Sequence, residues 1–229
     1  MKDIVFVTGN PGKVESAKKY FGDSNVNLEW YKHNAEEPKV NDIVLIATEK
    51  VVNAYKMVSK PCIAIDAGFY INNFPDNPGF PGAFPKREIL DKMGITGLLD
   101  IMTEVTDRSC YFMECLAYYD GHEVRYFYGI SKGFLATSIK GVSREEKWSD
   151  LWYVFIPQNH ELTLAEMDAD ERNNRIDGHT SALGEFSSWC KTEQIGNDSY
   201  TKKQCRWYIV FLLDNFITVE GKSHIIWYN

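Results

Sequence analysis

The stretch IVFVTGNPGK at residues 4–13 decides the fold. Four apolar residues predict a buried strand over 4–7, and the apolar residues of 14–21 predict a helix directly after it. Gly9 and Gly12 allow close approach of the backbone, and the free N–H groups at a helix N-terminus favour an anion. Lys13 falls in the first helical turn, where a cation is unfavourable for the helix itself, which suggests a ligand-facing role.

This loop taken alone leaves a second interpretation open. Its spacing is not that of a Walker A loop, which needs Gly-x-x-x-x-Gly-Lys-Ser/Thr. The same turn residues occur in an ordinary strand–turn–helix corner with a solvated lysine. These ten residues fit such a corner about as well as they fit an anion site. The loop therefore predicts an anion site only in combination with other motifs.

Strands and helices continue to alternate after this corner, which predicts an α/β fold with a mixed sheet. The most regular helical pattern covers 43–58 and has N-cap candidates in Asn41 and Asp42. Asp120-Gly121 separates two apolar runs and predicts a β-hairpin. The expected strands are 28–31, 62–65, 111–119, 123–128 and 134–139, with late strands at 208–213 and 216–219; further expected helices are 88–102, with a possible break at Gly94 or Gly97, 164–174 and 181–189.

Composition excludes some classes of protein. The net charge of −7 argues against a nucleic-acid-binding surface, which is basic, but leaves room for a small anionic ligand held by a few local cations. Five cysteines without a C-x-x-C pair predict buried thiols in the cytoplasm. The N-terminus lacks the pattern of a secretory signal, and the longest apolar run, 207–213, is too short to span a bilayer, so no membrane association is expected.

Four blocks of sequence occur in the order typical of one enzyme family. The first is Thr8-x-Asn10-x-x-Lys13, and the second is Ile65-Asp66-Ala67-Gly68-Phe69. The third is the proline- and glycine-rich run 77–86 with Leu90-x-Lys92-x-Gly94-x-x-Gly97-Leu98; the fourth runs from Leu164 through Arg172-Asn173 and His179 to Glu185. Together they resemble the inosine triphosphate pyrophosphatase family, whose members act on non-canonical purine nucleoside triphosphates.

The resemblance implies an elongated, two-lobed α/β fold with a mixed sheet and a central nucleotide cleft. It also implies a Mg²⁺-dependent reaction, with Mn²⁺ as a possible substitute, in which water attacks the α-phosphate and releases pyrophosphate and a nucleoside monophosphate. Family members are typically homodimers. We expect residues 1–190 to form the pyrophosphatase-like domain and residues 191–229 to form a C-terminal extension packed on it.

The resemblance also implies which residues bind the triphosphate and the metal. Asp66 ends an apolar strand and is expected to bind Mg²⁺ or to act as base toward the attacking water; an aspartate that caps its own turn is the alternative. Glu37, favoured over Glu36, is the expected second metal ligand, although a solvated charge pair explains either one. Lys13 and Lys50 are expected to neutralise phosphate charge in catalysis, although a solvated surface lysine is the strong alternative for Lys50. The remaining expected substrate contacts on this side are Thr8 and Asn10.

The other end of the expected site departs from the family pattern. Gly178-His179-Thr180 keeps the histidine of a Ser-His-Arg motif that contacts the purine, but it has neither the serine nor the arginine. Trp148 is expected to stack on the base and Asp150 to supply the acidic group, although the glycine and proline of the family's loop are missing, and core packing is an equal alternative for Trp148. Arg172 stands where the family has a lysine and offers a fork for phosphate.

Three functions therefore stay open. The first is a pyrophosphatase for inosine- or xanthosine-type triphosphates, and the second is a pyrophosphatase with altered base specificity. The third is a nucleotide-binding protein of the same fold without turnover. A septum-inhibitor type of hydrolase is disfavoured, because the chain lacks the serine-rich, arginine-bearing loop after its first strand.

Overall fold

The structure is a computed structural model, and it describes residues 2–22, 26–32, 40–143, 147–175 and 178–195. The chain divides into two compact units, Met1–Lys191 and Thr192–Asn229. The fold below is that of the first unit. The expected strands at 208–213 and 216–219 lie outside the described residues.

A mixed seven-stranded sheet forms the centre of this unit. Strands β1 (Lys2–Val7), β2 (Val26–Tyr31) and β3 (Cys62–Ile71) are parallel to one another, with β1 in the middle. Strands β5 (Ser109–Tyr119), β6 (Val124–Leu135) and β7 (Phe155–Pro157) continue the sheet in antiparallel order beyond β3, and β4 (Pro81–Gly82) pairs with the end of β3. The predicted α/β fold with a mixed sheet is confirmed.

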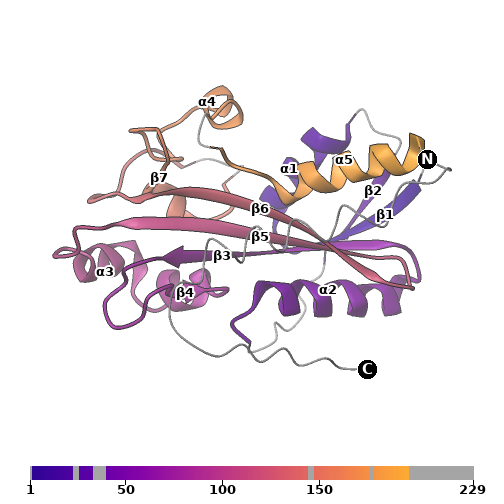
Figure 1. Cartoon of the computed structure of the whole chain (residues 1–229), viewed down its shortest axis with the longest axis horizontal. Helices are drawn as coiled ribbons and strands as arrows, with labels where there is room; N and C mark the ends of the chain where they lie inside the picture. The colour runs from indigo at the N-terminus through magenta and orange to yellow at the C-terminus, as the bar shows by residue number, and fades with distance from the viewer. Residues whose placement is uncertain (1, 23–25, 33–39, 144–146, 176–177, 196–229) are drawn as a thin grey trace, which may run out of the picture. The chain divides into compact units, whose positions relative to one another are not determined.

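Helices cover both faces of the sheet (Figure 1). Helix α2 (Ile43–Val58) packs on one face, where its residues Ile46, Ala47 and Val51 join Cys115 in one core cluster. Helices α1 (Pro11–Phe21) and α5 (Ala182–Ile195) lie on the other face, and Phe21 and Phe186 meet there with ring centroids 5.8 Å apart.

Local signals account for the ends of α1 and α2. The side chain of Asp42 accepts hydrogen bonds from the backbone N–H groups of Val44 and Leu45, and it thereby caps α2 as the sequence predicts. Asn10 caps α1 in the same way through Gly12, and Pro11 takes the first helical position, where its missing N–H costs nothing.

A third core cluster surrounds the far half of the β5–β6 hairpin. It contains side chains from the π-helix Lys86–Leu90, from α3 (Gly94–Ile101) and from the 3₁₀-helix Asp150–Tyr153. The predicted helix 88–102 is therefore two short helices, and the break falls at Gly94, one of the two predicted positions, where φ is +67°.

Two expected elements are wrong. Residues 134–139 do not form a separate strand, because β6 runs without interruption to Leu135. The expected helix 164–174 shrinks to α4 (Ala169–Asn173). The Glu166 carboxylate accepts hydrogen bonds from the N–H and the hydroxyl of Thr163, and this local turn replaces the first part of the helix. Within the described ranges, no helix is both long and apolar enough to cross a membrane.

Candidate functional site

A cleft of about 1440 Å³ lies beyond the carboxyl end of β1, along the edge of β3. The register explains this position: Val7 is the last β1 residue to pair with β3, opposite Ala64, whereas β3 continues to Ile71. Nine of the ten predicted site residues line the cleft, and Glu37 lies outside the described residues; the nine are Thr8, Asn10, Lys13, Lys50, Asp66, Trp148, Asp150, Arg172 and His179.

The loop between β1 and α1 is held by hydrogen bonds of its own side chains. The Thr8 hydroxyl accepts from the N–H of Asn10 at 3.1 Å, and the side-chain Oδ1 of Asn10 accepts from the N–H of Gly12 at 2.9 Å. The Asn10 amide also donates to the carbonyl of Trp148 at 3.4 Å. These bonds fix the start of α1 at the cleft and connect it to the residues of the 147–153 segment.

Lys13 projects from the first turn of α1 into the cleft. Its Nζ donates to the carbonyl of Ile65 at 2.9 Å, at a point of the β3 edge that β1 no longer covers. The same Nζ lies 5.7 Å from the ring centre of Trp148, whose indole N–H donates to the hydroxyl of Ser16 at 3.0 Å. Lys13 and Trp148, which are 135 positions apart in the sequence, therefore face the same space.

Asp66 and Lys50 form an ion pair on the face of the sheet that carries α2. Lys50 Nζ, on α2, lies 2.7 Å from Asp66 Oδ1, on β3, and the two side chains are 18% and 8% exposed. The pair joins a helix to a strand at the wall of the cleft, and both side chains are largely buried. It also holds the Asp66 carboxylate at the cleft. Asp66 is the residue that the sequence predicts as a metal ligand.

The described part of the chain contains no group of three or more histidine, cysteine, aspartate or glutamate side chains that could hold a metal. Mg²⁺ does not need such a group, because it is commonly bound by one or two carboxylates together with water and phosphate oxygens. The Asp66 carboxylate has the hard oxygen donors that Mg²⁺ prefers, and it lines the cleft. Asp66 thus fits the role of one protein ligand.

Two predicted ligands of the substrate also make contacts within the protein. Arg172 is only 8% exposed, and its Nη1 donates to the carbonyls of Met167 and Leu164, while its guanidinium carbon lies 5.4 Å from the centre of the Trp152 ring. Asp150 pairs with Lys147 Nζ at 2.5 Å and is half exposed. The contacts of Arg172 also stabilise the turn before α4, so its role as a substrate ligand stays a prediction.

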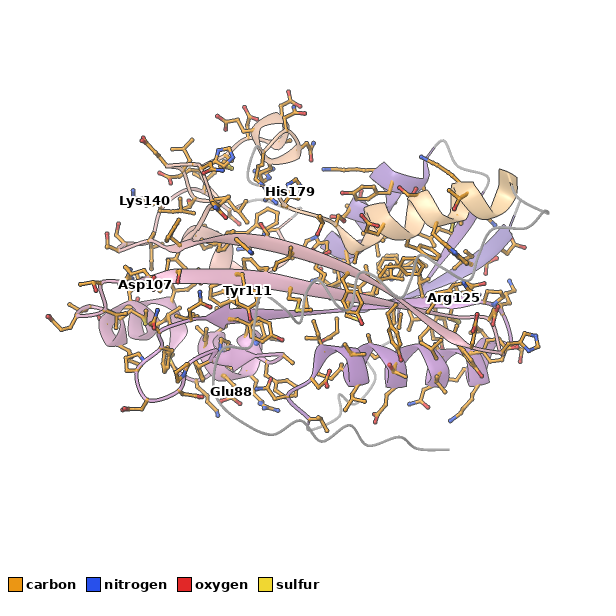
Figure 2. All side chains as sticks on the ribbon, viewed as in Figure 1. Glu88, Asp107, Tyr111, Arg125, Lys140 and His179 are labelled. Carbon is orange, nitrogen blue, oxygen red and sulfur yellow. The ribbon has the colours of Figure 1, made fainter. Side chains whose placement is uncertain are left out.

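His179 lies on the side of the sheet that carries α1 and α5 (Figure 2). Its neighbour Thr180 forms an antiparallel bridge with Ile130 of β6, with backbone hydrogen bonds of 2.9 and 3.2 Å. Gly178 has a φ of +65°, which glycine adopts without strain. The bridge fixes the 178–181 segment against the hairpin and places His179 at the cleft.

Glu114 is a cleft residue that the sequence analysis missed. It lies on β5, and its Oε2 accepts from the N–H of Ala182 at 3.2 Å. Burial raises the pKa of the Glu114 carboxyl above its ordinary value, while the Ala182 N–H, Lys13 and Arg175 act in the opposite direction. One signal in the sequence could have revealed it. Glu114 is the single charged residue in the otherwise uncharged run of β5, and a charged residue in such a strand is rarely buried without a functional or structural partner.

Comparisons with known proteins find relatives along most of the chain. Residues 4–189 match the model of the Ham1 family. A dITP/XTP pyrophosphatase of Thermococcus kodakarensis is 31% identical over 188 residues, which are 82% of this chain and 97% of that protein. A dITP/XTP pyrophosphatase of Saccharolobus solfataricus is 28% identical over 205 residues, or 88% of this chain and 96% of that protein.

Solved structures share the fold. A Ham1 protein from Coxiella burnetii superimposes with a TM-score of 0.69 at 21% identity, covering 85% of this chain and 99% of that one. The Staphylococcus aureus Ham1 protein gives a TM-score of 0.67 at 22% identity, with 84% and 100% coverage. The resemblance drawn from the four sequence blocks is confirmed: this chain is a member of the Ham1 family.

Proposed function

We propose that this chain hydrolyses a non-canonical purine nucleoside triphosphate to the monophosphate and pyrophosphate in a Mg²⁺-dependent reaction. One observation carries the proposal: a single cleft brings Lys13, at the start of α1, together with the Asp66 carboxylate of β3. A cation beside a helix N-terminus suits a triphosphate, and a carboxylate opposite suits a metal or a water molecule. The names of the relatives in Thermococcus and Saccharolobus support the same reaction.

The proposed reaction breaks one phosphoanhydride bond. The oxygen of a water molecule attacks the α-phosphorus, the bond from that phosphorus to the bridging oxygen breaks, and pyrophosphate leaves. The proton of the attacking water passes to the Asp66 carboxylate or, if Asp66 serves as a metal ligand, to solvent. Lys13 stabilises negative charge on the phosphate oxygens as the transition state forms.

In this proposal, Lys50 positions Asp66 in addition to neutralising phosphate charge. Its ammonium group donates to Asp66 Oδ1 at 2.7 Å, and it therefore orients the carboxylate. Thr8 and Asn10 hold the loop from which Lys13 extends into the cleft. When bound at Asp66 and, as we further propose, Glu37, Mg²⁺ or Mn²⁺ supplies Lewis-acid polarisation of the phosphate oxygens.

The base is proposed to lie at the other end of the cleft, near Trp148 and His179. Trp148 offers an aromatic face, with its indole N–H already bound to Ser16. Asp150 and Arg172 complete the proposed substrate contacts. Because Thr180 replaces an arginine of the family motif, we propose that the base preference differs from that of inosine-type enzymes.

A substrate panel tests the proposed activity. The full chain is incubated with Mg²⁺ and with inosine, xanthosine, guanosine, adenosine and pyrimidine triphosphates, and pyrophosphate is measured; turnover should vanish with EDTA and return with Mg²⁺. Tight binding of a triphosphate with no pyrophosphate from any of them would instead support a binding protein without turnover. Release of inorganic phosphate alone would contradict the assigned bond.

The location and assembly of the protein form part of the same proposal. The four described cysteines, Cys62, Cys110, Cys115 and Cys190, are buried free thiols, which suits the cytoplasm.

We also propose that residues 1–190 are the catalytic domain, that 191–229 pack on it, and that the chain is a homodimer. Light scattering of the full chain tests the homodimer, and the activity and urea stability of a version ending at residue 190 test the other two points.

A further inference from the structure

Arg87 is a cationic residue of the cleft wall that the proposed reaction leaves without a role. It belongs to the π-helix Lys86–Leu90, which follows β4 in the chain, and its side chain lines the cleft. That side chain is 52% exposed, so the guanidinium is accessible to a ligand.

Two contacts fix the plane of the Arg87 guanidinium. Its central carbon lies 3.8 Å from the centre of the Phe84 ring, close enough for a cation–π contact, and its Nε donates to Glu88 Oε1 at 2.6 Å. The Phe84 side chain is itself buried in the core, so the ring is a firm support. Within the described ranges, no residue accepts a hydrogen bond from either terminal amino group, Nη1 or Nη2. These two groups form a fixed pair of donors at the cleft.

The charge of Arg87 is not cancelled by its carboxylate partner. Glu88, labelled in Figure 2, also accepts a hydrogen bond from Lys92 Nζ through Oε2, so two cations share one negative charge. Hydrogen bonds from Lys92 and Arg87 lower the pKa of the Glu88 carboxyl below its ordinary value, which keeps it ionised at neutral pH. Lys86 and Asp91 on the same wall add one charge of each sign. This part of the wall is therefore positive and suits an anion.

The Phe84 ring places Arg87 on the same face of the sheet as the proposed catalytic pair. Phe84 belongs to the core cluster under α2, which also contains Val7 and Cys115. Cys115 stands directly opposite Asp66 in the pairing of β3 with β5, and directly opposed residues share a face. The Arg87 fork and the Asp66 carboxylate thus approach the cleft from the same side.

The base is proposed to lie toward the opposite face of the sheet. Trp148 is bound there to Ser16 of α1, and α1 lies on the face away from α2 (Figure 1). With the base beside Trp148 and the α-phosphate at Asp66, the β- and γ-phosphates extend toward the α2 face, where Arg87 lies. A guanidinium donates two parallel hydrogen bonds to one phosphate group, and its plane is already set here.

We propose that Arg87 binds the β- and γ-phosphates of the nucleotide through its two terminal amino groups and holds the pyrophosphate as it leaves. This inference rests on the proposed hydrolase function and adds a residue to the phosphate end of the same site. Negative charge grows on the oxygen between the α- and β-phosphates as that bond breaks. A fixed guanidinium on the leaving side stabilises this charge, so Arg87 should affect both substrate binding and rate.

Calorimetry with magnesium pyrophosphate tests the assignment without depending on turnover or on the identity of the base. Arg87→Gln should bind pyrophosphate roughly tenfold or more weakly than the wild type, because it loses a charge-assisted contact. Arg87→Lys keeps the charge but not the planar fork, and it should recover only part of the affinity. Lys92→Gln is the matched control: Lys92 binds the same carboxylate, is not among the cleft-lining residues, and should leave the affinity unchanged. Circular dichroism checks that each variant is folded.

Inosine and xanthosine monophosphates separate the two ends of the site. Their single phosphate corresponds to the α-position, so their affinities should be equal in the wild type and in Arg87→Gln. Unchanged pyrophosphate binding in Arg87→Gln, an equal loss in Lys92→Gln, or an equal loss for pyrophosphate and the monophosphates would each overturn the inference. A wild type that binds no pyrophosphate would overturn it as well.

Failure of the proposed function has a different signature. If no triphosphate of the substrate panel yields pyrophosphate, the hydrolase function is overturned. A selective loss of pyrophosphate affinity in Arg87→Gln would then still assign Arg87 to the terminal phosphates of a bound nucleotide.

Discussion

Lys50 Nζ and Asp66 Oδ1 lie 2.7 Å apart and join helix α2 to strand β3. Both side chains are largely buried, so each charge depends on the other for its stability. The pair stands at the cleft, and it therefore affects both the fold and the proposed chemistry.

Lys50→Met should lower the free energy of unfolding by about 3 kcal/mol, because it leaves the Asp66 carboxylate buried without its cation. Urea denaturation measures this loss. Lys60→Met is the matched control: the Lys60–Glu29 pair is 47% and 44% exposed, and its removal should cost far less. Equal losses in the two variants would contradict a special role for the buried pair.

Asp66→Asn should reduce kcat by about 10²–10⁴-fold, because the amide neither accepts a proton from water nor binds a divalent cation well. Pyrophosphate release under saturating substrate measures kcat, and circular dichroism checks that the protein is folded. Asp100→Asn, an exposed position on α3, should leave kcat unchanged. Activity retained in Asp66→Asn would remove this residue from the site.

Lys13→Ala should raise KM roughly tenfold or more, since one charge-assisted contact to phosphate is worth about 1.5–3 kcal/mol. The fold should survive, because Lys13 lines the cleft, is not among the buried residues of α1, and is replaced by a good helix former. Lys18→Ala, on the same helix and mostly exposed, is the control and should leave KM as it is. If KM and kcat both stay at wild-type values in Lys13→Ala, the loop does not bind the phosphates.

Trp148→Ala should weaken the use of every purine substrate by roughly tenfold, with little change in the ratio between them, because stacking is tolerant of base identity. Trp148→Phe keeps an aromatic face and loses the bond to Ser16. We therefore expect it to retain most of kcat/KM. A change in the substrate ratio with no general loss would show that Trp148 reads the edge of the base.

Glu114 should make stability depend on pH. Its pKa in the folded protein is raised, chiefly by burial, so the folded chain holds this proton to a higher pH than the unfolded chain does. The stability that this adds is complete below the ordinary value of 4.5 and is lost as pH rises through the raised pKa. Relative to the wild type, Glu114→Gln should become progressively more stable from pH 4.5 upward, as urea denaturation at several pH values can measure; a constant difference would contradict this.

Local signals made the first half of the site predictable. The strand at 4–7, the capping Asn10 and the proline at the first helical position all lie within eight residues, and they suffice to place Lys13 at a helix start. The break near Gly94 was predictable only in part, because the sequence offers Gly94 and Gly97 equally and Gly97 lies inside α3. The expected 164–174 helix failed because the Thr163–Glu166 turn competes with the helix through hydrogen bonds that a periodic apolar pattern does not reveal.

Contacts between distant segments were not predictable from the same signals. Glu114 reaches the cleft only because β5 pairs with β3 and β6 in one register, and because Gly129 leaves room above its own backbone. The contact of Trp148 with Ser16, 132 positions away in the sequence, likewise depends on tertiary packing. Single-sequence reasoning named most of the residues and could not supply their partners.

The alternation of β5 has an evolutionary consequence. Asp66 lies on β3 and Glu114 on the paired strand β5, but their side chains point to opposite faces of the sheet. A substitution at position 114 therefore changes one wall of the cleft without altering the contact between Lys50 and Asp66, which lies on the opposite face of β3. In evolutionary terms, that wall is free to vary while the proposed catalytic pair is kept.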